Sequence, residues 1–568
     1  MSFRAALVHA VSVVTLTVPV AVVAAAPSSR SPVGSRASKP APQAPKSREK
    51  HWLLAITTPA ASVVGQAPLP YKDLWGAQPA SSALVDLSAV SCANVFFCAA
   101  VGQYQDATGA QSGLLDVLWR GRWRAYAAPE PAVDPAGGTP GISGPTSGLY
   151  SGLQAVSCPA VGRCTAVGSY RDSQGQVWGL IETFQDGRWA PAAAPEPARN
   201  VAGEGPGEVQ TYSGLGSISC TSPTFCVAVG MYNDAAEFSY GLIDTYQGGR
   251  WAALAAPEPA LDGAGQVAGS DSSGEQAGDL SAIACPASER CVAVGDYRDA
   301  AGNEWPLIDQ LAGTSWTAAA PPEPMAPATH RSRSNAPVPD AYAFLSGIAC
   351  AGATSCSAAG AYADPGHHRY GLLETLSDGR WQDVSAPEPE RDPSGVGAGT
   401  ATDDEANATL AAVGCLRTSY CVAVGDYKDA KGEPTGLLEV YDRGSWAGFS
   451  PPLPRRDALG GGPALDVSGE AEATFTTAWC GAGNFCVSAG AYDDNMGNSV
   501  GLIAQLGSKG WQAVVAPAPQ GPFQLGITAR QAVAVNDVSC APDGTCALVG
   551  TYEDGQGNTF GLIDRYRV

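Results

Sequence analysis

Short apolar runs separated by polar turns recur along the chain, and the unit from Leu153 to Pro197 shows their order. It contains four runs rich in Val, Ile, Leu or aromatic residues, each bounded by Gly, Asp or Pro: residues 153–158, 163–170, 178–184 and 188–197. Runs of this length between turn residues are typical of β-strands. The pattern therefore predicts four strands per unit, joined mostly by short turns.

Pairs of cysteines mark the same unit throughout the chain. Every pair has the spacing Cys-x5-Cys, and each opens a unit of roughly 65 residues, which is the signature of a repeat architecture. The pairs are Cys92 and Cys98, Cys158 and Cys164, Cys220 and Cys226, Cys285 and Cys291, Cys350 and Cys356, Cys415 and Cys421, Cys480 and Cys486, and Cys540 and Cys546.

We expect each cysteine pair to form a disulfide, because its members end the first strand and begin the second. Cysteines opposite each other on antiparallel strands bring their Cα atoms within disulfide reach. Zinc sites usually space two cysteines by two to four residues and need further ligands, whereas this chain has few histidines. The sequence therefore predicts one disulfide per unit and neither a metal nor a cofactor.

The turn between the second and third strands has the form Tyr-x-Asp-x-x-Gly, as at Tyr170–Gly175 and Tyr427–Gly432. Asp can accept a hydrogen bond from the backbone two residues on, and Gly can adopt positive φ, so both residues favour a tight turn. A Ca²⁺ site is the alternative interpretation, but one carboxylate per turn supplies few of the ligands that Ca²⁺ takes.

The fourth strand begins with Trp and ends in proline, usually in the sequence Pro-Glu-Pro, which indicates an edge strand. The last unit stops before this strand, and the segment His51–Pro59 near the other end of the chain matches it. If that segment completes the last sheet, the ends of the chain close a ring. We therefore predict an all-β fold: an eight-bladed β-propeller of four-stranded antiparallel blades over residues 51–568. Two stacked four-bladed rings are the alternative.

The N-terminus predicts export. Residues 1–26 contain Arg4, a long apolar stretch and small residues before Pro27, which is the pattern of a cleaved signal peptide. An uncleaved anchor over Ala5–Ala26 is the alternative, since that run is long enough to span a bilayer. Residues 27–50 are rich in Pro, Ser and basic residues and are expected to form a disordered linker. We predict a secreted or cell-surface protein with no membrane span after cleavage, a setting in which disulfides persist.

Charge limits the partners. Residues 27–50 carry a net charge of +5, whereas residues 51–568 carry −27. A body this acidic repels phosphate backbones, so nucleic acid is excluded as a partner. We expect a monomer whose partner is an extracellular protein or glycan.

The layout resembles the Asp-box and sialidase-like β-propellers, whose repeat runs from an inner strand, through a strand ending in Val-Gly, to a Gly-bounded turn before a Trp. The resemblance covers residues 51–568 at the level of repeat pattern. In Phe184–Trp189 the Asp lies three residues before the Trp, which is closer than an Asp-box requires. No sialidase catalytic set can be placed on this sequence, so the resemblance implies the fold and not that activity. The pattern is also similar to that of secreted bacterial Cys-x5-Cys repeat proteins.

Candidate binding residues are those at which one unit departs from the others. Trp479, Asn536 and Asp537 replace small residues on first strands, where they would face the central channel and contact a ligand; the alternative is that they fill or seal the ring. Trp305 and the pair His367 and His368 mark turns between second and third strands. Exposure without function is the alternative for the histidines.

A third-strand acid recurs in seven units, and its repetition indicates a structural role, with the Arg of the fourth strand as the expected partner. These acids are Asp116, Glu182, Asp244, Asp309, Glu374, Glu439 and Asp564.

Two classes of function follow. The first is a non-enzymatic recognition or scaffold protein that binds a protein or glycan through the face carrying the long connections between units, since long loops on a rigid scaffold often carry function. The second is a glycan-active hydrolase or lyase that uses carboxylates at the channel mouth, with Asp537 as the candidate. The sequence holds no recognisable catalytic motif, which favours the first class.

Overall fold

The computed structural model describes residues 54–57 and 84–567, apart from internal gaps. The predicted signal peptide, the linker and His367 lie outside the described residues. The gaps are residues 106–108, 134–149, 199–211, 235–237, 261–277, 300–301, 320, 322–341, 364–367, 378, 393–407, 457–471, 482–484, 508–509, 517–531, 542–543 and 554–558.

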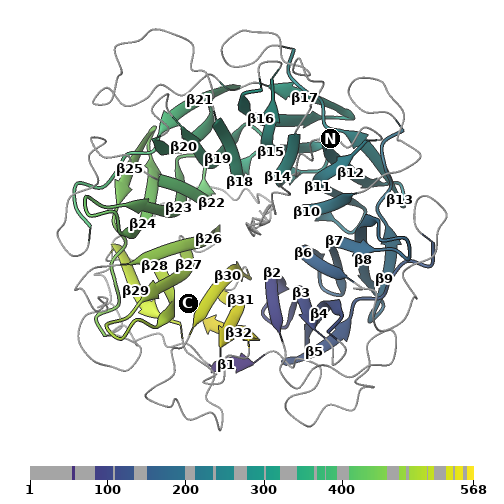
Figure 1. The fold of residues 1–568 in the computed structure, drawn as a ribbon, viewed down its shortest axis with the longest axis horizontal. Helices are drawn as coiled ribbons and strands as arrows, with labels where there is room; N and C mark the ends of the chain where they lie inside the picture. The colour runs from purple at the N-terminus through teal and green to yellow at the C-terminus, as the bar shows by residue number, and fades with distance from the viewer. Residues whose placement is uncertain are drawn as a thin grey trace, which may run out of the picture.

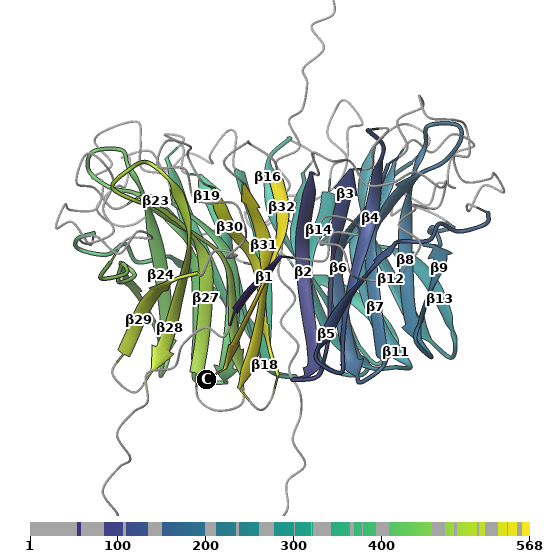
Figure 2. The same ribbon diagram turned by 90° about the horizontal axis from the view of Figure 1, so that it is seen from below.

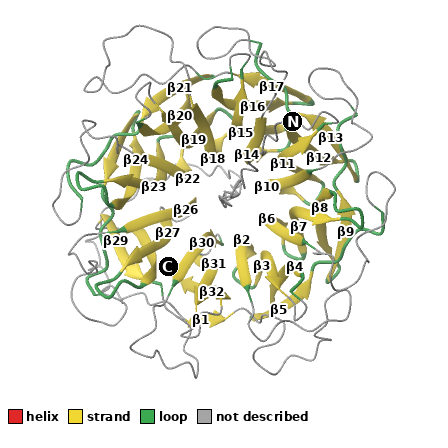
Figure 3. Ribbon diagram, viewed as in Figure 1, coloured by secondary structure: helices red, strands yellow, loops and turns green. Residues whose placement is uncertain are grey.

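Every element of the described chain is a β-strand (Figure 3). The first strands of the successive units are β2 (Val85–Asn94), β6 (Ser151–Ala160), β10 (Ser213–Ser222), β14 (Gly278–Ala287), β18 (Tyr342–Gly352), β22 (Ala408–Arg417), β26 (Ala473–Gly481) and β30 (Val533–Cys540). The second strands are β3 (Phe97–Gln105), β7 (Arg163–Arg171), β11 (Phe225–Asn233), β15 (Arg290–Arg298), β19 (Ser355–Ala363), β23 (Tyr420–Lys428), β27 (Phe485–Asp493) and β31 (Thr545–Glu553). The third strands are β4 (Gln111–Trp119), β8 (Val177–Gln185), β12 (Ser239–Gln247), β16 (Glu304–Ala312), β20 (Arg369–Ser377), β24 (Pro434–Asp442), β28 (Ser499–Gly507) and β32 (Thr559–Arg567). The fourth strands are β5 (Arg122–Ala127), β9 (Arg188–Ala193), β13 (Arg250–Ala255), β17 (Ser315–Ala319), β21 (Arg380–Ser385), β25 (Ser445–Phe449) and β29 (Gly510–Val515), and β1 (Leu54–Thr57) takes this place in the last unit.

Strands within a unit pair antiparallel in chain order. Six units form separate four-stranded sheets, and the fourth and fifth units share an eight-stranded sheet through one parallel bridge between Glu304 and Tyr342. Similar single bridges join Gln111 to Tyr150, Val177 to Tyr212 and Ser499 to Ala532. The predicted all-β class and the four-stranded antiparallel unit are confirmed.

The sheets stand around a central axis, with the first strand of each unit innermost and the fourth outermost (Figure 1). The strands run approximately along that axis (Figure 2). The apolar core lies between neighbouring sheets: Leu115 of the first unit, for example, shares a buried cluster with Val156 and Leu180 of the second. The second and third strands are apolar on both sides because each sheet is covered on both faces by its neighbours. In the outermost fourth strand, exposed and half-buried residues alternate.

The two ends of the described chain meet in one sheet, because β1 pairs antiparallel with β32. This pairing is the one that the segment His51–Pro59 predicts. The register differs by one residue from the one expected if Trp52 took the place of the tryptophans of the other fourth strands. In the first unit, Ala125 pairs with the third-strand acid Asp116 and lies two residues after Trp123. In the last unit, Ala55 pairs with Asp564 and lies three residues after Trp52.

One hydrogen bond recurs between the first strands of neighbouring units. The amide of Cys158 donates to Ser91 Oγ (3.0 Å), that of Cys220 to Ser157 (3.1 Å) and that of Cys285 to Ser219 (3.1 Å). The same bond links the last unit to the first, from the amide of Cys92 to Ser539 Oγ at 3.1 Å. The first and eighth units therefore contact each other as consecutive units do.

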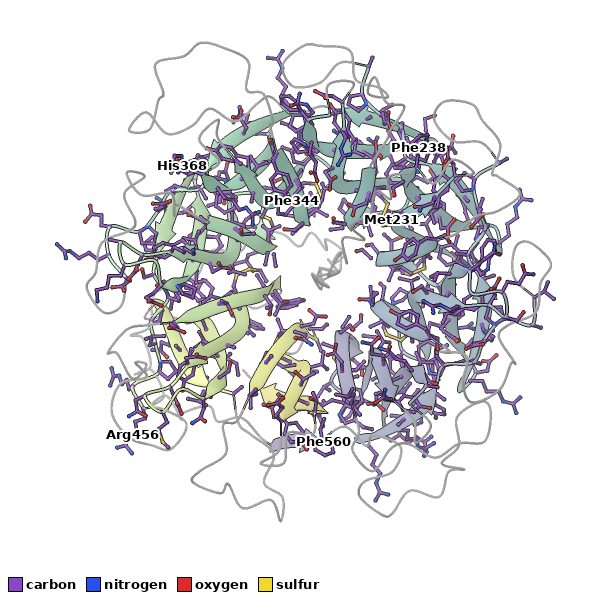
Figure 4. All side chains as sticks on the ribbon, viewed as in Figure 1. Met231, Phe238, Phe344, His368, Arg456 and Phe560 are labelled. Atoms are coloured by element: carbon purple, nitrogen blue, oxygen red, sulfur yellow. A yellow bond between two sulfur atoms is a disulfide. The ribbon has the colours of Figure 1, made fainter. Side chains whose placement is uncertain are left out.

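All eight predicted disulfides are present, and no described cysteine is free. Each closes the hairpin between the first and second strands, where the two cysteines of the third unit, for example, pair directly. The yellow sulfur bonds are visible within the sheets in Figure 4. The bonds join Cys92 to Cys98, Cys158 to Cys164, Cys220 to Cys226, Cys285 to Cys291, Cys350 to Cys356, Cys415 to Cys421, Cys480 to Cys486, and Cys540 to Cys546.

The glycine of the recurring Val-Gly motif is fixed by close backbone approach. A Cβ added at Gly230 would overlap the carbonyl oxygen of Gly214 on the neighbouring first strand, immediately before the register shift between Leu215 and Ser217. Seven further units carry the same contact at the equivalent glycine. The bulged first strand thus requires glycine opposite it.

The Asp turn has the predicted geometry. In the second unit, Asp172 Oδ1 accepts hydrogen bonds from the amides of Gln174 and Gln176, both at 2.8 Å. Gly175 lies at φ +88° and donates its amide to the Asp172 carbonyl at 3.2 Å. The carboxylate is therefore used by the turn itself, as turn chemistry requires.

Candidate functional site

Trp479 is buried, with 7% of its surface exposed. Its ring centroid lies 5.4 Å from that of Phe485, and it packs against Val535 and Val538 of the eighth unit. A Cβ at Gly481 would overlap the indole, so this glycine makes room for the ring. The structure gives Trp479 a packing role between the seventh and eighth units, and ligand binding by it stays a prediction.

Asn536 and Asp537 contact neighbouring units. Asn536 is the bulged residue of β30, and its Nδ2 donates to the carbonyl oxygen of Leu87 (2.9 Å) and to Asp86 Oδ1 (3.0 Å) in the first unit. The bulged residue Thr476 makes the equivalent bond, donating to the Val535 carbonyl at 2.6 Å. The Asn536 amide thus serves a contact that also occurs between the seventh and eighth units.

Three donors surround the buried Asp537 carboxyl. Its Oδ2 accepts from the Val90 amide (2.8 Å), and its Oδ1 accepts from the Val538 amide (2.8 Å) and from Thr477 Oγ1 (3.1 Å). Burial raises the pKa of Asp537 to about 7, although these hydrogen bonds act in the opposite direction. Asp537 therefore joins the first, seventh and eighth units.

The turn candidates lie apart from these residues. Trp305 is buried and donates its indole N–H to Asp299 Oδ2 at 2.8 Å, and Trp178 makes the same bond to Asp172 at 2.9 Å. Trp305 therefore supports its turn as Trp178 does and is not unique to its unit. His368 is half-buried and lies away from the central axis (Figure 4).

A carboxyl cluster in the fourth unit was missed by the sequence reasoning. Asp279 and Asp296 pair directly across β14 and β15, and Glu304 begins β16. The Asp296 carboxyl hydrogen-bonds both neighbouring carboxyls, and burial followed by these two charges raises its pKa well above the usual range. Two carboxyls hydrogen-bond each other only if one is protonated. Asp296 follows the Val-Gly motif where the second unit has Ser169, so a comparison of units would have found it.

Two cations and a tyrosine lie beside this cluster. The Arg298 guanidinium partly offsets the burial that raises the pKa of Glu304. The backbone of Tyr342 in the fifth unit forms a parallel bridge with that of Glu304. The Arg369 guanidinium lies 5.5 Å from the centre of the Tyr342 ring. The cluster therefore combines three half-buried acids, a phenol and guanidinium groups at the junction of the fourth and fifth units.

A groove lies at the opposite end of the strands, between the first and second units. Its volume is about 450 Å³, and we call it the Trp119 groove. It is lined by Val117, Trp119, Arg124, Tyr126, Val161, Gly162, Arg163, Phe184, Asp186 and Gly187. A cavity of this size accommodates a small ligand.

The Trp119 groove combines exposed apolar surface with charge. Trp119 is 36% exposed and Val161 51% exposed, although both are large and apolar. Below them Phe97 packs edge-on against Trp119, with 5.6 Å between ring centres. The guanidinium groups of Arg124 and Arg163 supply donors at the wall, since Arg donates up to five hydrogen bonds.

The same groove recurs between the fifth and sixth units with a different lining. It measures about 410 Å³ and is lined by Thr354, Ser355, Thr375, Leu376, Ser377, Gly379, Thr418 and Tyr441. The fold therefore creates the groove, and the first unit adds Trp119 and Arg124 where the second has Gln185 and Ala190.

Among the residues that the structure describes, no three His, Cys, Asp or Glu side chains are placed to hold a metal ion. The described part of the chain contains no helix long and apolar enough to cross a membrane.

No family model and no curated protein matches this chain. Several solved structures are similar in shape at low identity. The polysaccharide lyase Uly1 is 8% identical, with 71% of this chain and 88% of that chain covered and a TM-score of 0.36. A Trypanosoma rangeli sialidase in complex with sialic acid is 9% identical, with coverages of 72% and 52% and a TM-score of 0.31. A variant of AofleA from Arthrobotrys oligospora is 9% identical, with coverages of 67% and 88% and a TM-score of 0.28. At such identities and TM-scores these likenesses carry no conclusion about the activity of this chain.

Proposed function

We propose that this chain is a secreted, disulfide-stabilised eight-bladed propeller that recognises a glycan through the Trp119 groove without catalysis. The observation that carries the proposal is the combination, in one groove, of an exposed Trp, two Arg side chains and the single carboxylate of Asp186. The long connections first considered for binding lie mostly outside the described residues, so the proposal concerns the opposite end of the strands.

The contacts between the first and eighth units support a closed ring. The bond from Cys92 to Ser539 repeats the one between consecutive units, and β1 completes the sheet of the eighth unit. Apolar residues Val85 and Leu87 share a buried cluster with Val549 and Ile563. We also propose that residues 1–26 direct the export of the protein and that the ring is a monomer.

Glycan chemistry fits the Trp119 groove. A sugar ring presents an apolar C–H face, which an exposed aromatic side chain can cover, and a rim of hydroxyls that need hydrogen-bond partners. Trp119 offers the face, while Arg124, Arg163 and Asp186 offer donors and acceptors. Glycosidases flank the bond to be cleaved with two carboxyl groups, and this groove has one, which favours binding over cleavage.

Replacing Trp119 by Ala is expected to weaken glycan binding at least tenfold, because the ligand loses its stacking surface. The wild-type chain would first be screened on an immobilised glycan array, and affinities for the retained glycans would be measured by calorimetry. Arg124→Ala is expected to weaken binding as well, while Trp119→Phe keeps most of it. Phe96→Ala is the matched control, since Phe96 is 64% exposed and does not line the groove. Equal affinity of the wild type and Trp119→Ala, or an array that retains nothing, would contradict the proposal.

The carboxyl cluster favours a second candidate, a glycan-active hydrolase or lyase. Carboxyls that share protons can act as acid and base, and Tyr342 and Arg369 lie beside them. If the chain cleaves a glycan, Glu304→Gln is expected to reduce the release of reducing ends at least a hundredfold with unchanged thermal stability. Cleavage that persists in this variant would remove the cluster from the reaction. Asp537→Asn is a poor test of the original candidate, because Asp537 also holds three units together.

A further inference from the structure

The seven third-strand acids are fully buried, with 0% of each residue's surface exposed. Neither oxygen of any of them has a hydrogen-bond partner among the described residues. They are Asp116, Glu182, Asp244, Asp309, Glu374, Glu439 and Asp564. Buried carboxyls are normally paired or hydrogen-bonded, so a repeated exception requires a physical explanation.

The expected arginine partners lie elsewhere, which corrects the sequence prediction. In the third unit, Arg250 is exposed and pairs with Gln247 at the end of the sheet, three residues beyond Asp244. Asp244 itself lies between Ala228 and Ala253 on the flanking strands. The acid therefore sits among small apolar groups, and no cation of the described chain acts on it.

Second carboxyls face several of these acids from the neighbouring unit. Burial is the main cause of the raised pKa values of Asp244, Asp309 and Glu439. The charges of Glu196, Glu258 and Glu388 respectively, each from the Pro-Glu-Pro segment of the preceding unit, raise these pKa values further. Glu374 faces Asp383 on its own sheet. For Asp116, Glu182 and Asp564, burial is the cause of the raised pKa.

The seventh unit shows what replaces such a pair. Ala504 stands at the position of the third-strand acid, and Leu453 stands where the preceding unit would supply Glu. Both residues belong to one apolar cluster. In this unit both carboxyls are absent together, and apolar side chains fill the site.

Two facing carboxyls in an apolar junction cannot both be ionised without a counter-charge. No cation of the described chain acts on these acids, and no three metal-ligating side chains come together within that part of the protein. A proton is then the remaining counter-charge. Burial raises the pKa of Glu439 to about 9 and the pKa values of Asp116 and Asp564 to about 8. It also raises the pKa of Glu258, which faces Asp309, to about 7.

We propose that the third-strand carboxyls are protonated in the folded protein and that their ionisation loosens the junctions between units. The fold is then an acid-stable, alkali-sensitive assembly. At the junction of the fifth and sixth units, Glu388 faces Glu439 and raises its pKa in addition to burial. Two further acids, Asp392 and Asp429, act together with Glu388 on Tyr427.

The direction of the pH dependence follows from the raised pKa values. In the unfolded chain these acids ionise near 3.8 for Asp and 4.5 for Glu, whereas in the folded chain Glu439 ionises near 9. Between these values the folded state binds protons that the unfolded state has released. The folding equilibrium constant therefore falls up to tenfold per pH unit for each such group. The stabilisation that these bound protons provide is complete below the unfolded pKa values and is lost as the pH rises towards 9.

The experiment compares the full chain with Glu439→Gln, which keeps the shape and removes the charge. Thermal midpoints are measured from pH 4.5 to 9. We expect the wild type to lose stability steadily as the pH rises, and Glu439→Gln to raise the midpoint at pH 8.5 but not at pH 5. Asp442→Asn is the matched control, since Asp442 is exposed on the same strand and should not change the pH profile. Infrared spectra of the folded wild type at pH 7 should show a protonated-carboxyl C=O band that weakens in the variant.

Two results would overturn the proposal. One is a wild type at least as stable at pH 8.5 as at pH 5, with Glu439→Gln destabilised at both. The other is saturable stabilisation of the wild type by Ca²⁺ at pH 8.5 that Glu439→Gln abolishes, which would assign the counter-charge to a metal ion rather than to a proton.

Discussion

A chain that lacks all eight disulfides is expected to be unfolded at 37 °C and to show no cooperative thermal transition above that temperature. Each bond closes a loop between cysteines six residues apart, and a loop of that size is worth about 2 kcal/mol in the chain-entropy model. Eight such contributions together are comparable with or larger than the net stability of a typical domain, about 5–15 kcal/mol. The measurement is thermal circular dichroism of a chain with every cysteine changed to Ala, beside the oxidised wild type.

A graded series separates the disulfide effect from a packing effect. Removal of one pair, Cys220→Ala with Cys226→Ala, is expected to cost a few kcal/mol, since both side chains are also buried and leave small cavities. Direct reduction is a weaker experiment, because buried sulfurs react only after local opening. Retention of the wild-type midpoint within a few degrees by the chain without cysteines would show that the core alone holds the fold.

The strands and disulfides could be predicted because their information is local. Cys220 and Cys226 lie six positions apart, and the hairpin that joins them fixes their pairing. The Asp172 turn is equally local, since both amides bound by Oδ1 lie within four residues. Repetition of these short patterns also supplied the unit and its boundaries.

The candidate site could not be predicted because its partners are set by the contact between units. Asp537 was interpreted as a channel residue, yet its donors come from Val90 and Thr477, far away in the chain. The Trp119 groove likewise needs Arg163 and Phe184 of the next unit. The charge of Asp296 was visible in the sequence, but its contact with Glu304 required the register of β15 on β16.

Replacing Asp537 by Ala is expected to cost about 5 kcal/mol of stability, the largest single-residue effect that we expect. The change leaves the buried amides of Val90 and Val538 and the hydroxyl of Thr477 without an acceptor, at about 1–3 kcal/mol each. Chemical denaturation of the full chain measures the loss, and limited proteolysis reports whether the first and eighth units separate. Other first strands carry Ala at this position, for example Ala89, so the cost arises from the donors around Asp537 and not from the alanine itself.

Thr477→Val provides the matched comparison for Asp537→Ala. It removes one of the three donors and is expected to cost about 1 kcal/mol, because the carboxyl keeps both amide bonds. Since Asp537 is the common acceptor, Thr477→Val should add almost nothing once Asp537 is Ala, and this non-additivity measures the coupling across the junction. Equal and additive effects of the two changes would mean that the carboxyl does not join the first, seventh and eighth units through shared hydrogen bonds, and that the junction depends on apolar packing alone.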